Sequence, residues 1–179
     1  MSSVTIDPRY PIGEYVPKPF SIEQKIEWLA DIKFLPLQLE NAILNLDEAQ
    51  LQTPYREDGW TVHQLVHHVA DSHMNAYIRF KTGLTEDNPT IKPYEEAKWA
   101  ELADGNSDNI LPSIQIIEGV HSRWVLLLKS FGEKELKKQF IHPANNKTFC
   151  LDEIIGLYAW HCNHHLAHIT ELIKRKNWR

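Results

Sequence analysis

The sequence predicts an all-α protein: a four-helix bundle with a proline-rich N-terminal arm and a long loop between the second and third helices. Three observations support this prediction. Apolar residues recur at helical spacing in four segments. A Ser or Thr followed three residues later by Gln marks two helix starts. No segment shows a convincing strand pattern, and the 179 residues suffice for one domain, residues 1–179, with its own core.

The first part of the chain is an arm followed by a helix. Residues 8–19, PRYPIGEYVPKP, carry four prolines and predict an extended arm. Ser21 and Gln24 form a capping-box pattern and begin the first helix, in which Pro36 predicts a kink or a break. Residues 53–60, TPYREDGW, predict a turn-rich connector.

The second helix begins with another capping-box pattern, Thr61 and Gln64, and is expected to end near Gly83. Residues 84–109 are polar and predict a long loop, with a short helix around Glu95–Leu102. Long loops in compact domains often serve function, so this loop is a candidate cover for a site.

The last part of the chain supplies two more helices. They are expected over residues 110–130 and 151–174, with a turn at IHPANNKTF, residues 141–149, between them. In a helical bundle, sites are built from side chains on facing helices.

The bulk composition excludes several classes of protein. A formal net charge of -5 argues against a nucleic-acid partner. No apolar stretch reaches the roughly 20 residues of a membrane helix, and no signal peptide is recognisable at the N-terminus. Only two cysteines occur, Cys150 and Cys162, so no disulfide framework is implied and a cytoplasmic location is expected.

Histidines give the strongest functional signal, because four of them fall in WHCNHHLAH, residues 160–168. On a helix, His161, His164, His165 and His168 share an arc of about 100° and interrupt an apolar stripe. Several imidazoles on an inward face are costly without partners, and a metal ion is the simplest common partner. Two pairs are four residues apart, 161 with 165 and 164 with 168, and the spacing alone does not choose between them.

The third ligand is expected from the second helix, in HQLVHHVADSHMN. His68 sits at the edge of the apolar arc of that helix, whereas His67 lies a further 100° away, on the side of His63. His68 is therefore the better inward ligand. Its face also carries a polar strip expected to form a pocket wall: Gln64, Asp71, Ser72, Asn75 and Arg79.

Other notable residues have plainer expected roles. His73 and His121 are expected to be hydrogen-bonded core residues, and His63 and His142 to face solvent. Cys162 is expected to pack and Cys150 to be structural. Trp60 and Trp99, in or near loops, are candidates to line a pocket.

The chain resembles the DinB/YfiT superfamily, and within it the YfiT branch of metal-dependent hydrolases. Cys162 stands where another small residue is expected. The stretches that carry the resemblance are YPIGEY (10–15), TPYREDGWTVHQLVHHVADSHMNAYIRFK (53–81), KPYEEAKW (92–99) and LYAWHCNHHLAHITEL (157–172).

The resemblance implies a four-helix bundle of unusual connectivity, a cytoplasmic homodimer, and one divalent metal ion per subunit held by three histidines. The ligands would be His68, His161 and His165, which resolves the choice between the two late pairs. Zinc is the first expectation for the ion and nickel the second, since both accept imidazole.

Three functions remain open at this point. In a hydrolase of a small-molecule substrate, the ion activates water, Asp71 orients or accepts a proton, and His164 shuttles one. In a thiol S-transferase, the ion holds a bacillithiol-like low-molecular-weight thiol, and Arg79 with Lys92 receives its anionic part. In a non-catalytic stress-related protein, a fourth ligand, His164 or His168, closes the site. No nucleic-acid or membrane partner is expected.

Overall fold

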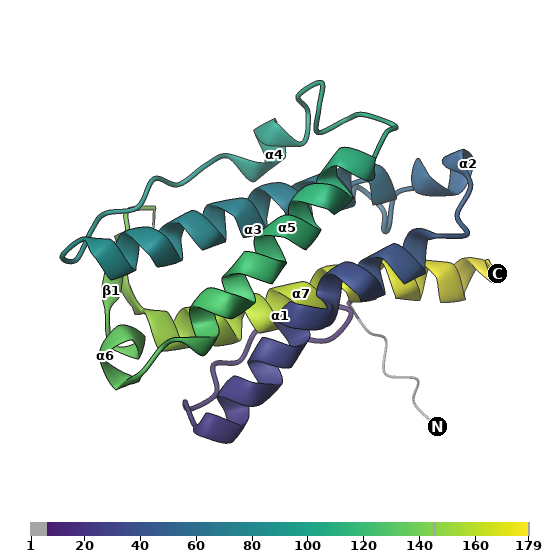
Figure 1. Cartoon of the computed structure of the whole chain (residues 1–179). Helices are drawn as coiled ribbons and strands as arrows, with labels where there is room; N and C mark the ends of the chain where they lie inside the picture. Colours follow the sequence, from purple (N-terminus) through teal and green to yellow (C-terminus); the bar gives the residue numbers. More distant parts are fainter. Residues whose placement is uncertain (1–6, 145, 179) are drawn as a thin grey trace.

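Four long helices form the protein, and a computed structural model describes residues 7–144 and 146–178. The long helices are α1 (Ile22–Ile43), α3 (Val62–Thr85), α5 (Leu111–Lys129) and α7 (Leu151–Lys176). Helix α1 packs against α7 and α5, and α3 packs against α5 and α7 (Figure 1). The four-helix bundle predicted from the sequence is therefore confirmed.

The helix starts follow the predicted capping signals. The Thr61 hydroxyl accepts a hydrogen bond from the Gln64 amide at 3.2 Å, and the Gln64 side chain accepts one from the Thr61 amide at 3.2 Å, which completes a capping box. At α1 the Ser21 hydroxyl caps the Gln24 amide at 3.0 Å, but the Gln24 side chain donates to Glu27 instead. Both starts were predicted, but only α3 has the reciprocal hydrogen bond of a capping box.

Helix α1 continues unbroken through Pro36, so a break there is excluded. Proline has no amide hydrogen, and the carbonyl of Ile32, four residues earlier, therefore lacks its helical donor. The Nδ1 atom of His121, on α5, bonds to this carbonyl instead. A backbone acceptor released in α1 is thus used by a neighbouring helix.

The turn expected at residues 141–149 is part of a small β-hairpin. Strand β1 (Gln139–His142) pairs antiparallel with β2 (Lys147–Cys150), with Phe140 opposite Phe149. The turn itself is confirmed, since the Asn146 amide donates to the Pro143 carbonyl at 3.3 Å. The strands on either side of it were missed because each has only four residues, too few for an alternating pattern to be recognised. The helical turns α2 (Glu48–Leu51) and α6 (Glu133–Leu136) are short elements that the sequence analysis also missed.

The long loop before α5 lies along α3 and carries the short helix α4 (Glu96–Trp99), as the sequence predicted (Figure 1). It is held to α3 by the side-chain amide of Gln64, which donates to the Ala100 carbonyl at 3.1 Å. At its start, Ile91 and Ile141 form a backbone hydrogen bond of 3.0 Å that ties the loop to the hairpin. The loop therefore covers one face of α3.

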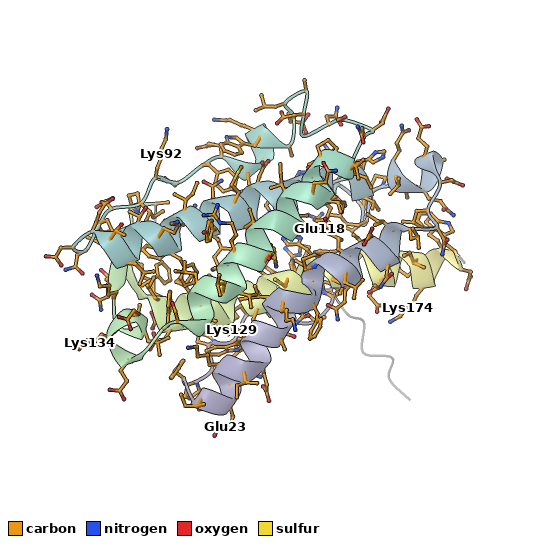
Figure 2. All side chains as sticks on the ribbon, in the orientation of Figure 1. Glu23, Lys92, Glu118, Lys129, Lys134 and Lys174 are labelled. Atoms are coloured by element: carbon orange, nitrogen blue, oxygen red, sulfur yellow. The ribbon has the colours of Figure 1, made fainter. Side chains whose placement is uncertain are left out.

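Apolar side chains from all four long helices fill the core, and most charged ones face outward. Glu118 and Lys129 on α5 and Lys92 on the loop point away from the bundle (Figure 2). In the part of the chain that the structure describes, no helix is long and apolar enough to cross a membrane. The largest fully buried side chains include Trp124, Phe80, Phe140, Ile32, Leu35, Leu39, Leu65, Ile117, Leu128, Leu151, Ile155 and Ile169.

Candidate metal centre

Helices α3 and α7 bring three histidines together inside the bundle. His68 comes from α3, and His161 and His165 come from successive turns of α7; one nitrogen of each lies within 4.8 Å of the others. The Nε2 atoms of His161 and His165 are 3.1 Å apart. The ring of His68 lies 4.9 Å from that of His165, centre to centre. These are the three residues that the sequence analysis chose.

Burial keeps these three rings neutral. It lowers the pKa of His68 to about 4, and it lowers the pKa values of His161 and His165 well below the ordinary value, with the neighbouring histidines adding to the effect. A neutral imidazole keeps one lone pair, which is what a metal ligand needs. Three neutral rings that converge in this way could hold a metal ion.

The geometry fits a zinc-sized divalent ion. Imidazole nitrogens bind zinc at about 2.0–2.1 Å, so two of them on one ion are no more than about 4.2 Å apart. The 3.1 Å between the Nε2 atoms of His161 and His165 is within that limit. The nitrogen of His68 lies within 4.8 Å of the other two, so a side-chain shift of a fraction of an ångström brings it within the same limit.

The three histidines have an aromatic neighbour, Trp60, on one side and a hydroxyl group, that of Ser72, on another. The Trp60 ring lies 4.6 Å from that of His68, so Trp60 does flank the site. The Ser72 hydroxyl is 3.5 Å from Nε2 of His161. The Nδ1 atom of His165 is buried and has no hydrogen-bond partner within residues 7–144 and 146–178. His161 is partly exposed to solvent, whereas His68 and His165 are buried.

In the other predicted pair, His164 and His168 also face each other, and their Nε2 atoms are 3.1 Å apart. His164 stacks on Trp160 at 4.4 Å, and the His168 ring lies 4.1 Å from that of Tyr55. With a nitrogen of His165, these two histidines form a second group within 4.8 Å. His165 is common to both groups, so the two groups compete for its lone pair.

The polar strip predicted on α3 includes a carboxyl group with an unusual pKa. Burial, and next the nearby Asp104 carboxylate, raises the pKa of Asp71 to about 6. Tyr94, on the long loop, lies close enough to Asp71 and Ser72 for both to affect its pKa, which burial raises. The loop therefore covers this strip, as expected.

Arg79 ends the same strip in a partly buried position. Its Nη1 atom donates to the Tyr158 hydroxyl at 3.3 Å, and its Nε atom is buried and has no hydrogen-bond partner among the residues that the structure describes. In the described ranges no carboxylate lies within ion-pair distance of this guanidinium. Lys92, proposed beside it from the sequence, is exposed on the loop.

Of the two histidines expected to face solvent, His63 does not and His142 does so only in part. His63 is only 4% exposed, because the long loop folds back over it and brings Asp108 to 3.9 Å from its Nδ1 atom. His142 is partly buried at the hairpin. His67, placed on the other side of α3 by the helical wheel, does point away from the centre, with its Nδ1 atom 2.7 Å from the Ser113 hydroxyl.

The remaining expectations for the core are confirmed. His73 and His121 are 0% and 1% exposed, and their nearest nitrogens are 2.7 Å apart. Cys162 is fully buried, with its sulfur within 4.8 Å of a nitrogen of His73 and of one of His121, and burial raises the pKa of its thiol well above the ordinary value. Cys150 is the N-cap of α7, and its sulfur accepts from the Gln139 amide at 3.2 Å.

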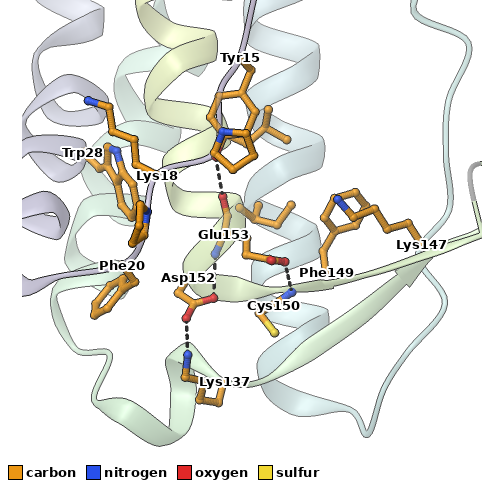
Figure 3. Close-up of a pocket in the computed structure, with 14 residues that line it drawn as sticks. Tyr15, Lys18, Phe20, Trp28, Lys137, Lys147, Phe149, Cys150, Asp152 and Glu153 are labelled. Atoms are coloured by element: carbon orange, nitrogen blue, oxygen red, sulfur yellow. Dashed lines mark hydrogen bonds and ion pairs between the residues drawn. The ribbon is translucent and has the colours of Figure 1, made fainter.

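A separate cavity of about 560 Å³ opens at the start of α7, between the N-terminal arm and the hairpin (Figure 3). Its carboxylates are already engaged: Asp152 pairs with Lys137 at 2.7 Å, and Glu153 accepts from the Cys150 amide at 3.1 Å. None of the clustered histidines lines this cavity. It is therefore distinct from the histidine cluster.

Helical bundles that gather ligand side chains on facing helices form a recurrent class of metal-binding fold, and this chain has that arrangement. The chain belongs to the DinB superfamily, whose family model matches residues 36–169. It is 45% identical to "Putative metal-dependent hydrolase YfiT" of Bacillus subtilis (strain 168), covering 99% of each chain. It is 54% identical to a "Putative metal-dependent hydrolase" of Bacillus cereus (strain 03BB102), over 96% of this chain and 99% of the relative.

Solved structures agree with the fold. The structure described as "YfiT from Bacillus subtilis is a probable metal-dependent hydrolase with an unusual four-helix bundle topology" matches with a TM-score of 0.94 and 44% identity, covering 97% of this chain and 100% of that one. A mycothiol-dependent maleylpyruvate isomerase matches with a TM-score of 0.60 and 20% identity, over 83% of this chain and 60% of that one. The second likeness extends to the fold alone.

Proposed function

We propose that the protein is a metal-dependent hydrolase of a small-molecule substrate, with one divalent ion per subunit held by His68, His161 and His165. The observation that carries the proposal is the convergence of three neutral imidazoles from two helices, with two Nε2 atoms 3.1 Å apart. The names of the relatives support the same class.

The bound ion would act as a Lewis acid, polarising the substrate and lowering the pKa of water towards roughly 7. Asp71, one turn beyond His68, would accept a proton, since a base with a pKa of about 6 is largely ionised at neutral pH yet still basic. His164, one residue before a ligand, would move a proton between the site and solvent. Arg79 would hold an anionic group of the substrate.

Zinc is the proposed ion and nickel the alternative. Three imidazoles suit several divalent ions, so elemental analysis of the purified protein is the direct measurement. Stoichiometric zinc that is lost on His68→Ala is the expected result.

A second candidate function is transfer of a low-molecular-weight, bacillithiol-like thiol to an electrophile. It is favoured by Arg79, a partly buried cation without a carboxylate partner in the described ranges, which would receive the anionic part of such a thiol. Metal coordination deprotonates thiols, so the same three histidines suit this chemistry. A third candidate is a non-catalytic metal protein.

One assay separates these functions. The metal-loaded protein is incubated with a thiol and a chloro-aromatic electrophile, and in parallel with a panel of esters and amides. Turnover of an ester or amide without thiol, lost on His68→Ala, supports the hydrolase. Thioether formation that is lost on His68→Ala supports the transferase and contradicts the hydrolase. Inactivity throughout, with four protein ligands on the ion, leaves the non-catalytic protein.

The matched control for this assay is His63→Ala. His63 is a buried histidine on the same helix, but its described contact is with Asp108 and not with the centre. Turnover within a few-fold of the wild type is expected for this variant. Equal losses in His63→Ala and His68→Ala would count against the proposed site.

We also propose that the protein is a cytoplasmic homodimer. Exposed apolar side chains on α1, Ile22, Ile26 and Phe34, surround a groove of about 430 Å³ that Val125 of α5 also lines. Apolar surface of this kind commonly marks a protein interface. Light scattering of the wild type and of Phe34→Glu tests it: a dimer that becomes a monomer in the variant is expected, and a monomeric wild type contradicts it.

A further inference from the structure

A row of imidazoles connects the centre to the backbone of α1. The Nδ1 atom of His161 lies 2.9 Å from Nε2 of His73, and Nδ1 of His73 lies 2.7 Å from Nε2 of His121. Nδ1 of His121 bonds to the carbonyl of Ile32. The three rings come from α7, α3 and α5 and the carbonyl from α1, so all four long helices contribute to the row.

The end of the row fixes where every proton lies. A carbonyl only accepts, so Nδ1 of His121 must carry a hydrogen; in a neutral ring its Nε2 is then an acceptor. That acceptor requires a hydrogen on Nδ1 of His73, whose Nε2 in turn accepts from Nδ1 of His161. Nε2 of His161 is left with a lone pair, and it faces Nε2 of His165.

The carbonyl at the end of the row is available because of Pro36. Residue 36 would normally donate its amide hydrogen to the carbonyl of Ile32, and proline has none. The carbonyl is therefore a strong acceptor inside the core, and His121 is the donor that satisfies it. Neither His73 nor His121 has solvent as an alternative partner, since they are 0% and 1% exposed.

We propose that His121 and His73 are positioning residues, which hold His161 as the tautomer protonated on Nδ1 and thereby present its Nε2 lone pair to the ion. The inference rests on the proposed metal centre for its consequence, although the tautomer itself exists without metal. The other neutral tautomer of His161 would carry a hydrogen on Nε2 and could not bind the ion through that atom. Hydrogen-bond partners of this kind commonly change metal affinity 10–100-fold.

The tautomers are measurable in the metal-free wild type by two-dimensional ¹⁵N–¹H NMR of the histidine rings. The expected result is a hydrogen on Nδ1 and none on Nε2 for all three rings of the row. A ring of His161 protonated on Nε2, or rings that exchange between tautomers, would overturn the proposal. This measurement needs no variant, so it decides the matter even if substitutions in the core prevent folding.

The consequence for the ion is tested with His73→Met and His73→Gln. Methionine fills the space but breaks the row, so zinc affinity, measured by competition with a chromophoric chelator, is expected to fall about 10–100-fold. Glutamine offers a donor and an acceptor on its terminal amide and is expected to recover most of that loss. His63→Met, a buried histidine on the same helix outside the row, is the control and should bind as the wild type does.

Two outcomes contradict the inference: wild-type zinc affinity in His73→Met, or equal losses in His73→Met and His73→Gln while both remain folded by thermal unfolding. Failure of the proposed function gives a different result. In that case zinc affinity would be unchanged in His68→Ala, while the NMR measurement would still decide whether the row fixes the tautomer of His161.

Discussion

Two histidine pairs on α7 look alike and have different surroundings. His161 with His165 and His164 with His168 have the same spacing, and in each pair the Nε2 atoms are 3.1 Å apart. The first pair meets His68 from α3, and His161 is bonded to the buried row of imidazoles. The second pair packs on aromatic rings instead.

Charge distinguishes the pairs further. The positive charges of Arg56 and Arg175 are among the causes that, after burial, lower the pKa of His168 to about 3. The same charges would repel a divalent cation between His168 and His164. Residue spacing alone therefore makes the two pairs equivalent, whereas the elements packed around them make the first pair the better candidate for a metal ion.

The largest expected effect comes from removing a ligand of the first pair. His161→Ala should lower zinc affinity more than the roughly 100-fold upper range for a residue that only supports a ligand. The matched change in the second pair, His168→Ala, should alter it less than about threefold, since this ring is not a proposed ligand. Competition with a chelator measures both. The reverse order of effects would move the centre to the second pair.

The next effect concerns turnover in place of binding. As a proton shuttle, His164 should be replaceable without loss of the ion, so His164→Gln should retain stoichiometric zinc and lose about 10²-fold or more in kcat. Steady-state kinetics on the substrate found in the ester and amide panel, with zinc content measured on the same sample, checks this. Wild-type kcat in the variant would make the second pair a packing feature only.

Removing the metal ion from the first pair should also lower the thermal stability of the protein. A ligand at 100 times its Kd stabilises the folded state by about 2.7 kcal/mol. For a chain of this size that is about 5–10 °C in Tm. Scanning calorimetry with zinc and with excess chelator measures the shift, which should vanish in His161→Ala and persist in His168→Ala. A shift that persists in both variants would mean stabilisation from another site.

The smallest effect involves Asp71, the carboxylate nearest in sequence to the first pair's third ligand. Its pKa of about 6 in the folded protein lies above the ordinary 3.8, so the folded state holds the proton more tightly than the unfolded state. Stability should therefore fall as pH rises from about 4 to 6, and Asp71→Asn should remove that fall. Because the group is half-exposed, the gain at pH 8 should be on the order of 1 kcal/mol or less.

Chemical denaturation of wild type and Asp71→Asn at pH 4 and pH 8 measures this difference. No difference at pH 4 and a more stable variant at pH 8 are expected, whereas equal stability at both pH values would contradict the raised pKa. If Asp71 also accepts a proton in turnover, activity should rise with pH through about 6, because the carboxylate form is the base.

Local signals in the sequence account for the helices and for the choice of His68. The capping box at Thr61 and Gln64 predicted the start of α3 to the residue, since both bonds form within four residues. The helical wheel separated His68 from His67 because that choice depends only on the helix itself. The two late pairs remained equivalent on the wheel; the family resemblance, not the pattern, chose between them.

Features that depend on distant segments could not be predicted. His63 looked exposed because the wheel does not include the long loop that covers it. The hairpin was missed because its four-residue strands gain their stability from each other and from the loop. Pro36 read as a kink or a break, and its connection to His121 needs the packing of α1 against α5.

The proposed metal centre is tested most directly by a crystal structure of the zinc-loaded protein, with the ion located by anomalous scattering at the zinc edge. We expect one strong peak per subunit, about 2.0–2.1 Å from a nitrogen of each of His68, His161 and His165, with the bond from His161 made by Nε2. A peak between His164 and His168, or one bonded to Nδ1 of His161, would contradict it.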